Sequence, residues 1–165
     1  MSLSADSQIR FAVPADVPAI LGLIRELAEY ERLLDQVVAD EVALHRALFG
    51  ERQYVEAFVA LVEGDCVGFA LFFHNFSTFL GKPGMYLEDL YVRPKFRGRG
   101  LGKALLTQVA RIAVERDCGR MEWSVLDWNE PSIRFYESLG AKPLTDWTIF
   151  RLTGDALRGL GRSEP

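Results

Sequence analysis

A glycine-rich segment in the second half of the chain constrains the fold more than any other feature. Residues 97–102 read Arg-Gly-Arg-Gly-Leu-Gly and follow an apolar stretch, about Met85 to Val92, that stops at Pro94. Apolar residues at helical spacing begin at Leu101, so the glycines separate a predicted strand from a predicted helix. Glycine lets backbone N–H groups approach an anion, and a helix start adds about half a positive charge there. The segment therefore predicts a phosphate-binding loop.

Two well-known nucleotide-binding motifs do not fit this loop. A Rossmann fingerprint that begins at Gly98 requires glycine or alanine at the position of Lys103. A P-loop that ends at Gly102-Lys103 requires glycine at position 97 and serine or threonine at 104, which are Arg97 and Ala104. We therefore expect a phosphate loop of another kind.

Helical and strand patterns alternate on both sides of the loop. Apolar residues at helical spacing predict a helix from the N-cap Asp16 to about Tyr30, and a second from the N-cap Asp40 to Gly50. A later helix begins at residues 129–131 and closes at Gly140. Apolar runs predict strands at 9–13, 54–62, 66–73, 85–92 and 121–125, with a turn at Gly64-Asp65, and two stretches that can finish a sheet at 141–144 and 147–152. The expected fold class is α+β, a mixed, mostly antiparallel central sheet flanked by helices.

Composition indicates a single domain. The chain has 165 residues, of which 49% are hydrophobic and 25% charged, so it can bury a core without disulfides or metal. We expect one domain over residues 1–165, with its core at about 8–152. Cys66 and Cys118, with two histidines, are too few for a disulfide framework or a metal cluster, so no metal is expected.

The net charge, the first residues and the hydropathy of the chain disfavour nucleic acid, secretion and a membrane span. The net charge of -4 disfavours nucleic acid, although its distribution matters more than its size. The first residues lack the apolar region of a secretion signal, and no apolar stretch approaches the 18 or so residues of a membrane span. We expect a cytoplasmic protein that binds neither membrane nor nucleic acid.

The loop and its flanking segments carry a resemblance to a known family. Arg-x-x-Gly-x-Gly, with the strand Tyr86–Pro94 before it, resembles the GNAT superfamily of acetyl-coenzyme A-dependent N-acetyltransferases. Residues 25–31, 86–92 and 128–136 look like its diamine (spermidine/spermine) branch, which includes thialysine acetyltransferases. The resemblance covers about residues 8–152 and implies the GNAT fold.

The resemblance implies that acetyl-coenzyme A is the co-substrate. The pantetheine arm would pair with the strand before the loop, and the loop amides would hold the pyrophosphate. Arg93 to Lys103 contains five cations and no acid, which suits an anionic cofactor. The implied cofactor-binding residues are Leu90, Tyr91, Val92, Arg97, Gly98, Arg99, Gly100, Leu101, Gly102, Lys103, Asn129 and Ser132.

Two residues are expected to move protons. Tyr136 matches the family's catalytic tyrosine, and a phenol with a pKa of about 10 can return a proton to the leaving thiolate. Glu88 matches the position proposed to take the proton from the amine, directly or through a water. Strand alternation predicts that Tyr86, Glu88 and Leu90 share one face, and Leu87, Asp89 and Tyr91 the other.

Acidic residues indicate a cationic acceptor. Residues 26–41 hold six carboxylates and one cation, most of which we expect to be a solvated helix face. Tyr30 and Glu31 match positions that bind the polyamine in the family, and we expect Glu88 and Asp89 to bind the substrate with them. Glu122, Trp123 and Ser124 lie where relatives line the acceptor side. The stretch 141–147 is shorter and less acidic than in polyamine-acetylating members, which leaves room for a thialysine-like amino acid or a short diamine.

Several alternatives stay open at this level. The leading expectation is direct attack by the amine within a ternary complex, and the rival mechanism is covalent catalysis through a cysteine. A non-catalytic acyl-CoA-sensing module, or an enzyme that acetylates a protein amine, is the alternative function. Relatives are commonly homodimers, and the aromatic run at 72–79 fits either a dimer surface or core.

Overall fold

The computed structural model describes residues 6–162, which divide into two compact units. The first ends at Leu126 and contains every strand; the second begins at Asp127 and contains two helices. Three short 3-10 helices, η1, η2 and η3, are Pro14–Asp16, Leu34–Gln36 and Pro94–Phe96.

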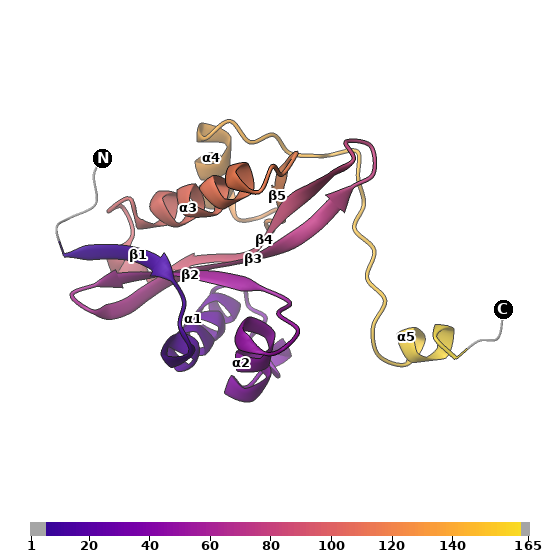
Figure 1. The fold of residues 1–165 in the computed structure, drawn as a ribbon, viewed down its shortest axis with the longest axis horizontal. Helices are drawn as coiled ribbons and strands as arrows, with labels where there is room; N and C mark the ends of the chain where they lie inside the picture. Colours follow the sequence, from indigo (N-terminus) through magenta and orange to yellow (C-terminus); the bar gives the residue numbers. More distant parts are fainter. Residues whose placement is uncertain (1–5, 163–165) are drawn as a thin grey trace. The chain divides into compact units, whose positions relative to one another are not determined.

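A five-stranded sheet forms the first unit (Figure 1). The strands are β1 (Ser7–Phe11), β2 (Glu56–Val62), β3 (Asp65–Ser77), β4 (Lys82–Val92) and β5 (Met121–Trp123). They lie side by side in chain order, with antiparallel pairing from β1 to β4 and parallel pairing between β4 and β5. The expected mixed, mostly antiparallel sheet is therefore confirmed.

The turn between β2 and β3 lies one residue before the predicted position. Val62 pairs with Asp65, so Glu63 and Gly64 are the two loop residues, with φ of 53° and 88°. Positive φ at both positions is the two-residue hairpin geometry whose twist matches that of the strands. Asp65, predicted as part of the turn, is the first residue of β3.

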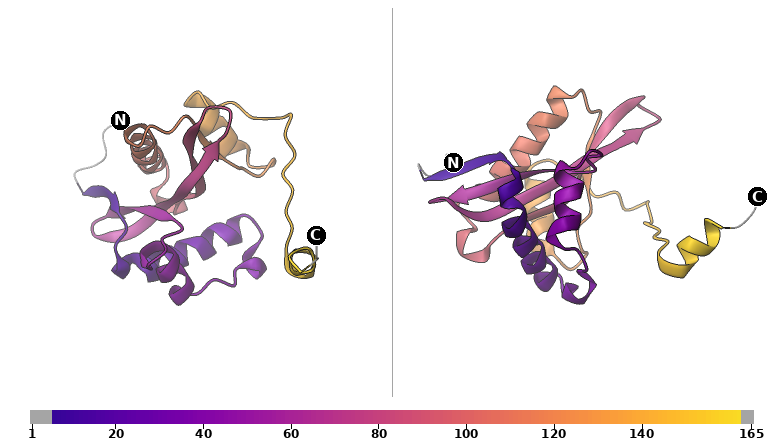
Figure 2. Two further views of the ribbon diagram at one scale, coloured as in Figure 1. Left: turned by 45° about the vertical axis from the view of Figure 1, so that its right-hand side comes forward. Right: turned by 60° about the horizontal axis from the view of Figure 1, so that its bottom comes forward.

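Helices cover both faces of the sheet. On one face, α1 (Val17–Tyr30) and α2 (Glu41–Phe49) bury Ile20, Leu23 and Leu48 against Phe69 and Leu71 of β3. On the other face lies α3 (Leu101–Glu115), with Leu101, Leu105 and Val109 fully buried (Figure 1). The further views keep α1 and α2 together on one side of the sheet (Figure 2). This arrangement places the end of β4, which leads into α3, between the two helical layers.

Of the two predicted N-cap residues, Asp16 and Asp40, only Asp40 caps its helix through its side chain. Asp40 accepts a hydrogen bond from the backbone N–H of Ala43 at 2.7 Å, as a helix N-cap does. Asp16 precedes α1 but does not cap it. Its carboxylate instead accepts from the N–H of Val13 at 2.7 Å and pairs with Arg10 at 2.6 Å, because the chain enters α1 through η1.

The aromatic run divides between core and surface. Phe72 is fully buried, with its ring 5.6 Å from that of Phe58. Phe73 is partly buried and packs against Tyr86, whereas Phe79 is 97% exposed at the β3–β4 connection. Phe72 therefore belongs to the core.

The second unit corrects the prediction for the end of the chain. It contains α4 (Glu130–Ser138), as expected, and α5 (Gly154–Leu160), which the sequence patterns did not predict. The predicted strands at 141–144 and 147–152 are absent from the described residues. A strand requires partners for its N–H and C=O groups, and no described strand pairs with this segment. Its apolar side chains are correspondingly exposed, Phe150 by 91%.

Among residues 6–162, no helix has the length and apolar character needed to cross a bilayer. The cytoplasmic location and the absence of membrane and nucleic-acid partners stay predictions.

Candidate functional site

Strand β4 continues past its neighbour and leaves an open edge. The parallel pairing with β5 joins Met85–Leu87 to Met121–Trp123, and residues 88–92 of β4 extend beyond the last of these pairs. A strand edge offers rows of N–H and C=O groups to any extended partner. The segment in question contains Leu90, Tyr91 and Val92, the residues expected along the pantetheine arm.

A β-bulge interrupts β4 at Glu88. Leu71 pairs with Asp89, but the next residue of β3, Phe72, pairs with Leu87, so Glu88 is the extra residue. Because Leu71 and Phe72 face opposite sides of β3, their partners Asp89 and Leu87 also face opposite sides. The simple alternation that placed Leu87 and Asp89 on one face is therefore wrong.

The bulge brings acidic side chains together. Asp89 lies opposite Leu71, on the face covered by α1 and α2, and is partly buried, whereas Glu88 is exposed. Burial, reinforced by the negative charges of Glu88 and Glu31, raises the pKa of Asp89 to about 7. Burial also raises the pKa of Glu31, which follows α1. Three carboxylates predicted for the acceptor side thus act on one another.

The glycine-rich loop has the conformation of an anion cradle. Gly98 and Gly100 have φ of 76° and 83°, in the left-handed region that favours glycine, and Gly100 directly precedes α3. A Cβ at Gly98, Gly100 or Gly102 would meet no protein atom within 4 Å. The chain therefore leaves open space next to the first amides of α3, where an anion is favoured.

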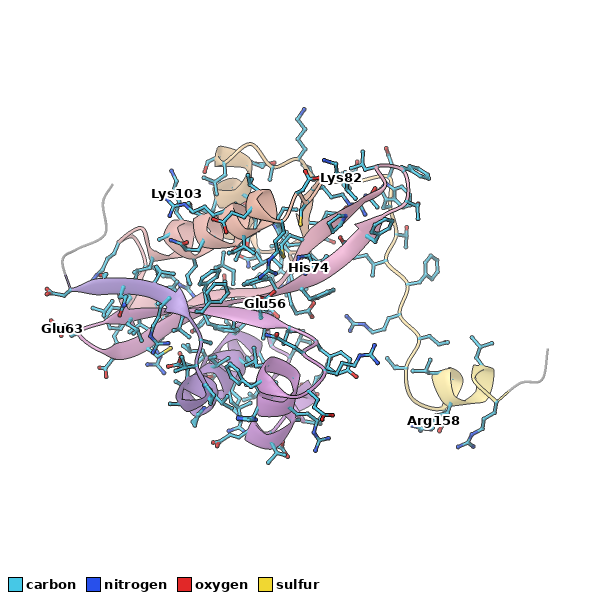
Figure 3. All side chains as sticks on the ribbon, in the orientation of Figure 1. Glu56, Glu63, His74, Lys82, Lys103 and Arg158 are labelled. Carbon is cyan, nitrogen blue, oxygen red and sulfur yellow. The ribbon has the colours of Figure 1, made fainter. Side chains whose placement is uncertain are left out.

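Cations surround this space. Lys103 projects from the start of α3 into solvent (Figure 3). Arg99 lies over the ring of Phe96, with its guanidinium carbon 5.3 Å from the ring centre, and Lys95 lies over the same ring at 4.8 Å. Both side chains keep their charge near the loop without an ion pair to an acid among the described residues.

Arg97 connects the loop to the end of α1. Its Nε donates to the carbonyl oxygen of Val92 at 2.8 Å. Its guanidinium carbon lies 5.2 Å from the ring centre of Tyr30 and 5.5 Å from that of Tyr91. The structure thus brings the predicted acceptor-side Tyr30 to the predicted cofactor loop.

Arg93 has a structural partner that sequence reasoning missed. Its guanidinium forms an ion pair with Glu26 of α1 at 2.8 Å and donates to the carbonyl oxygen of Cys66 at 3.2 Å. One cation of the basic segment and one acid of the acidic segment therefore neutralise each other. Separation by 67 residues left no local signal for this pair.

The weaker acceptor-side candidates on and after β5 have protein partners. Glu122 pairs with Arg120 at 2.9 Å and accepts from the side-chain amide of Asn75 at 3.0 Å. Ser124 shares a hydrogen bond of 2.9 Å with the hydroxyl of Tyr86. Trp123 is partly buried beside Leu87 in the parallel pairing. These contacts give Glu122 and Ser124 a role in holding the β3–β4–β5 region together.

The remaining candidates lie on α4 in the second unit. Asn129 is its N-cap and accepts from the N–H of Ser132 at 3.4 Å. Ser132 and Tyr136 are one turn apart on the helix, so their side chains lie on the same side of it. Tyr136 is partly buried and packs against Phe135, with ring centres 5.3 Å apart.

The arrangement suits binding of an anion at one end of β4 and of a cation at the bulge. Between them lies an open strand edge that can hold an extended molecule by its backbone groups. Among residues 6–162, no three His, Cys, Asp or Glu side chains are placed to hold a metal ion together.

Comparison with known proteins identifies relatives over nearly the whole chain. Residues 23–141 match the model of the acetyltransferase (GNAT) family. The thialysine N-epsilon-acetyltransferase of Bos taurus is 42% identical, covering 92% of this chain and 95% of that protein. The L-ornithine N5-acetyltransferase NATA1 of Arabidopsis thaliana is 37% identical, covering 94% and 88%. Among solved structures, the integron cassette protein VCH_CASS6 from V. cholerae has a TM-score of 0.80 at 27% identity, covering 97% of this chain and 100% of that one.

Proposed function

The protein belongs to the acetyltransferase (GNAT) family, and from this membership we propose that it moves an acetyl group from acetyl-coenzyme A to a primary amine of a small cationic molecule. The observation that carries the proposal is the course of β4, which leads from a carboxylate-bearing bulge, along an open edge, into a glycine cradle. Relatives named for acetyl transfer to nitrogens of thialysine and ornithine support the same reaction.

The chain's own residues suit the binding of acetyl-coenzyme A, which supplies an activated acetyl thioester. The amides from Gly98 to Lys103 would hold the pyrophosphate, with Arg99 and Lys103 neutralising its charge. The backbone of residues 90–92 would pair with the pantetheine arm and polarise the thioester carbonyl. Arg97 would fix the end of β4 through the Val92 carbonyl.

The acceptor amine would enter on the carboxylate side of β4. Glu31, Glu88 and Asp89 attract a cation, and Tyr30 marks the boundary with the loop through its contact with Arg97. The family resemblance assigns removal of the amine proton to Glu88 and return of a proton to the leaving thiolate to Tyr136. Asn129 and Ser132 are proposed as further cofactor contacts.

We favour direct attack of the amine on the thioester over an acetyl-cysteine route. Burial raises the pKa of the thiol of Cys66 and of Cys118, which disfavours the thiolate that such a route requires. Steady-state kinetics should therefore be sequential. Parallel double-reciprocal lines together with an isolable acetyl-enzyme would contradict this mechanism.

The substrate class proposed is a diamine, a polyamine or a thialysine-like amino acid. The short stretch 141–147 favours the smaller members of this class. The test is a panel of thialysine, ornithine, short diamines, spermidine, spermine and lysine peptides with acetyl-coenzyme A, followed by release of coenzyme A. Turnover of a small amine supports the proposal, turnover of peptides alone would indicate a protein acetyltransferase, and no turnover would indicate an acyl-CoA sensor.

We also propose that the protein is a homodimer, as relatives in the branch commonly are. Phe76 and Phe79, 60% and 97% exposed on the β3–β4 hairpin, offer apolar surface for such an interface. Sedimentation of the wild type and of Phe79→Ser tests this proposal. A dimer weakened by the substitution is the expected result, and a monomeric wild type would contradict it.

A further inference from the structure

Two neighbouring carboxylates at the β4 bulge are candidates for one task. Glu88 is exposed, whereas Asp89 is partly buried on the α1–α2 face, within reach of the charge of Glu31. We infer that Asp89, rather than Glu88, accepts the proton of the acceptor ammonium group. The inference rests on the amine acetyltransferase function proposed above and changes the residue to which the family resemblance assigns this step.

The bulge gives Glu88 and Asp89 different surroundings. Without it, Asp89 would share a face with Leu87, whose side chain is buried in the sheet's other layer. The extra residue instead turns Asp89 toward the layer that contains Leu71, Tyr91 and α1, and leaves Glu88 in solvent. Water competes with a substrate ammonium for Glu88, but much less for Asp89.

The charges around Asp89 increase its affinity for a proton. The charged groups acting on it are Glu88 on its own strand and Glu31 after α1, and no cation of the described residues is among them. Burial and these two acids raise the pKa of Asp89 to about 7. A carboxylate of this pKa is still ionised in about half the molecules at neutral pH, and it is a stronger base than an ordinary aspartate, whose pKa is about 3.9.

The position of Asp89 also suits the step. It directly precedes residues 90–92, the open edge of β4 proposed for the pantetheine arm. Successive strand residues advance by about 3.3 Å, so this carboxylate lies within a residue or two of the backbone proposed to hold the thioester. An amine bound at Asp89 therefore has its nitrogen near the carbonyl carbon that it attacks.

An N–H bond of the ammonium breaks, the proton passes to a carboxylate oxygen of Asp89, and the electron pair left on nitrogen forms the new C–N bond. The C–S bond breaks, and the leaving thiolate takes its electron pair and then a proton from Tyr136. The nitrogen, which still carries one proton too many after the attack, releases that proton to water, and Tyr136 regains a proton from water, so the products are a neutral amide and the thiol of coenzyme A. Asp89 releases its proton to water before the next turnover, while Glu88 and Glu31 keep the approach negatively charged.

The test compares Asp89→Asn with Glu88→Gln as a matched neutralisation of the adjacent carboxylate. The measured quantity is the pH profile of kcat/KM for an amine that the wild type acetylates, since this ratio reports groups of the free enzyme. The wild type should show an acid limb near pH 7. Asp89→Asn should lose about 10²- to 10⁴-fold in kcat/KM and lose the limb. Glu88→Gln and Glu31→Gln should keep the limb and move it to lower pH, because each removes a negative charge.

A limb that disappears in Glu88→Gln and persists in Asp89→Asn would overturn the inference but leave the amine acetyltransferase function intact. No release of coenzyme A by the wild type with any amine would instead contradict the proposed function. A ¹³C NMR titration of aspartate-labelled protein gives a readout without turnover. One carboxyl should titrate near pH 7 and be missing in Asp89→Asn; an Asp89 signal that titrates near pH 4 would overturn the inference.

Loss of folding can be told apart from loss of the base. The raised pKa means that the ionised Asp89 costs stability at pH values above its unfolded pKa. Asp89→Asn should therefore unfold at a temperature equal to or above that of the wild type at pH 8. A lower unfolding temperature would indicate a structural role and count against the assignment.

Discussion

Arg93 donates from Nη2 to Oε1 of Glu26 at 2.8 Å, so the end of β4 is tied to the middle of α1. The pair lies directly before the glycine loop and joins the basic and acidic segments of the sequence. Both side chains are about a third exposed, at 33% and 35%. Their contact therefore holds two elements in place and is partly screened by solvent.

Neutralising this pair should affect folding more than cofactor binding. We expect Glu26→Gln to lower the free energy of unfolding by about 0.5–1 kcal/mol, because both side chains of the pair are partly exposed to solvent. The KM for acetyl-coenzyme A should stay within about twofold, whereas Lys103→Gln should raise it by removing a charge next to the pyrophosphate. Urea unfolding and initial rates measure the two quantities. A large increase in KM for Glu26→Gln would show that Arg93 serves the cofactor.

Gly102→Ala should separate folding from cofactor binding. Gly102 lies in the first turn of α3, and a Cβ there meets no protein atom within 4 Å. Alanine should therefore raise the free energy of unfolding by about 0.5 kcal/mol. The new methyl group would occupy part of the open space proposed for the pyrophosphate and weaken one charge-assisted hydrogen bond to it. The KM for acetyl-coenzyme A should therefore rise about tenfold.

Gly22→Ala in α1 is the matched control for Gly102→Ala. Gly22 also lies in a helix, and its Cβ would likewise meet no protein atom within 4 Å. The same gain in stability is expected, without a change in KM for acetyl-coenzyme A. Equal KM values for both variants would contradict the assignment of the loop to the pyrophosphate.

Gly84→Ala should destabilise the β3–β4 hairpin. Gly84 pairs with Asn75, and an added Cβ would overlap the side-chain oxygen of Asn75. That oxygen is buried without a hydrogen-bond partner among the described residues, so a shift away from the new Cβ would not be compensated by a new hydrogen bond. A loss of about 1–3 kcal/mol is expected in denaturant unfolding. The double variant with Asn75→Ala should lose less than the sum of the two single losses, and strict additivity would refute the overlap.

Asp16→Asn should change the pH dependence of stability. The hydrogen bonds from Arg10 hold the pKa of Asp16 below its usual value, despite the opposing effect of burial. A lowered folded pKa stabilises the native state above the unfolded pKa of about 3.9, and this stabilisation is lost as pH falls through the folded value. The variant should therefore be about 2 kcal/mol less stable than the wild type at pH 7, with the difference shrinking below about pH 4. Thermal unfolding across pH measures it, and a difference that stays constant down to pH 2 would contradict the ionic role.

Much of the architecture was predictable because it depends on local patterns. Asp40 and Asn129 were recognisable as helix starts since their side chains bond to amides three residues on. The loop at 97–102 was recognisable because only glycine adopts its positive φ values readily. Local patterns gave a wrong prediction for residues 141–152. The residue types there suit a strand, but a strand also requires a neighbouring strand with which to form hydrogen bonds.

The amino-acid sequence by itself determined the order of strands and helices as far as Gly140, the glycine-rich loop and the presence of two adjacent acids before it, since each follows from residues close in the chain. Only the tertiary structure decided which acid is buried. The bulge at Glu88 becomes visible when β3 and β4 pair, and it turns Asp89 toward Glu31 and the α1–α2 layer. The tertiary structure likewise pairs the cation Arg93 with Glu26, which is far away in the sequence. A side chain's charge is set by its type, but its proton affinity and its partner are set by what the fold packs around it.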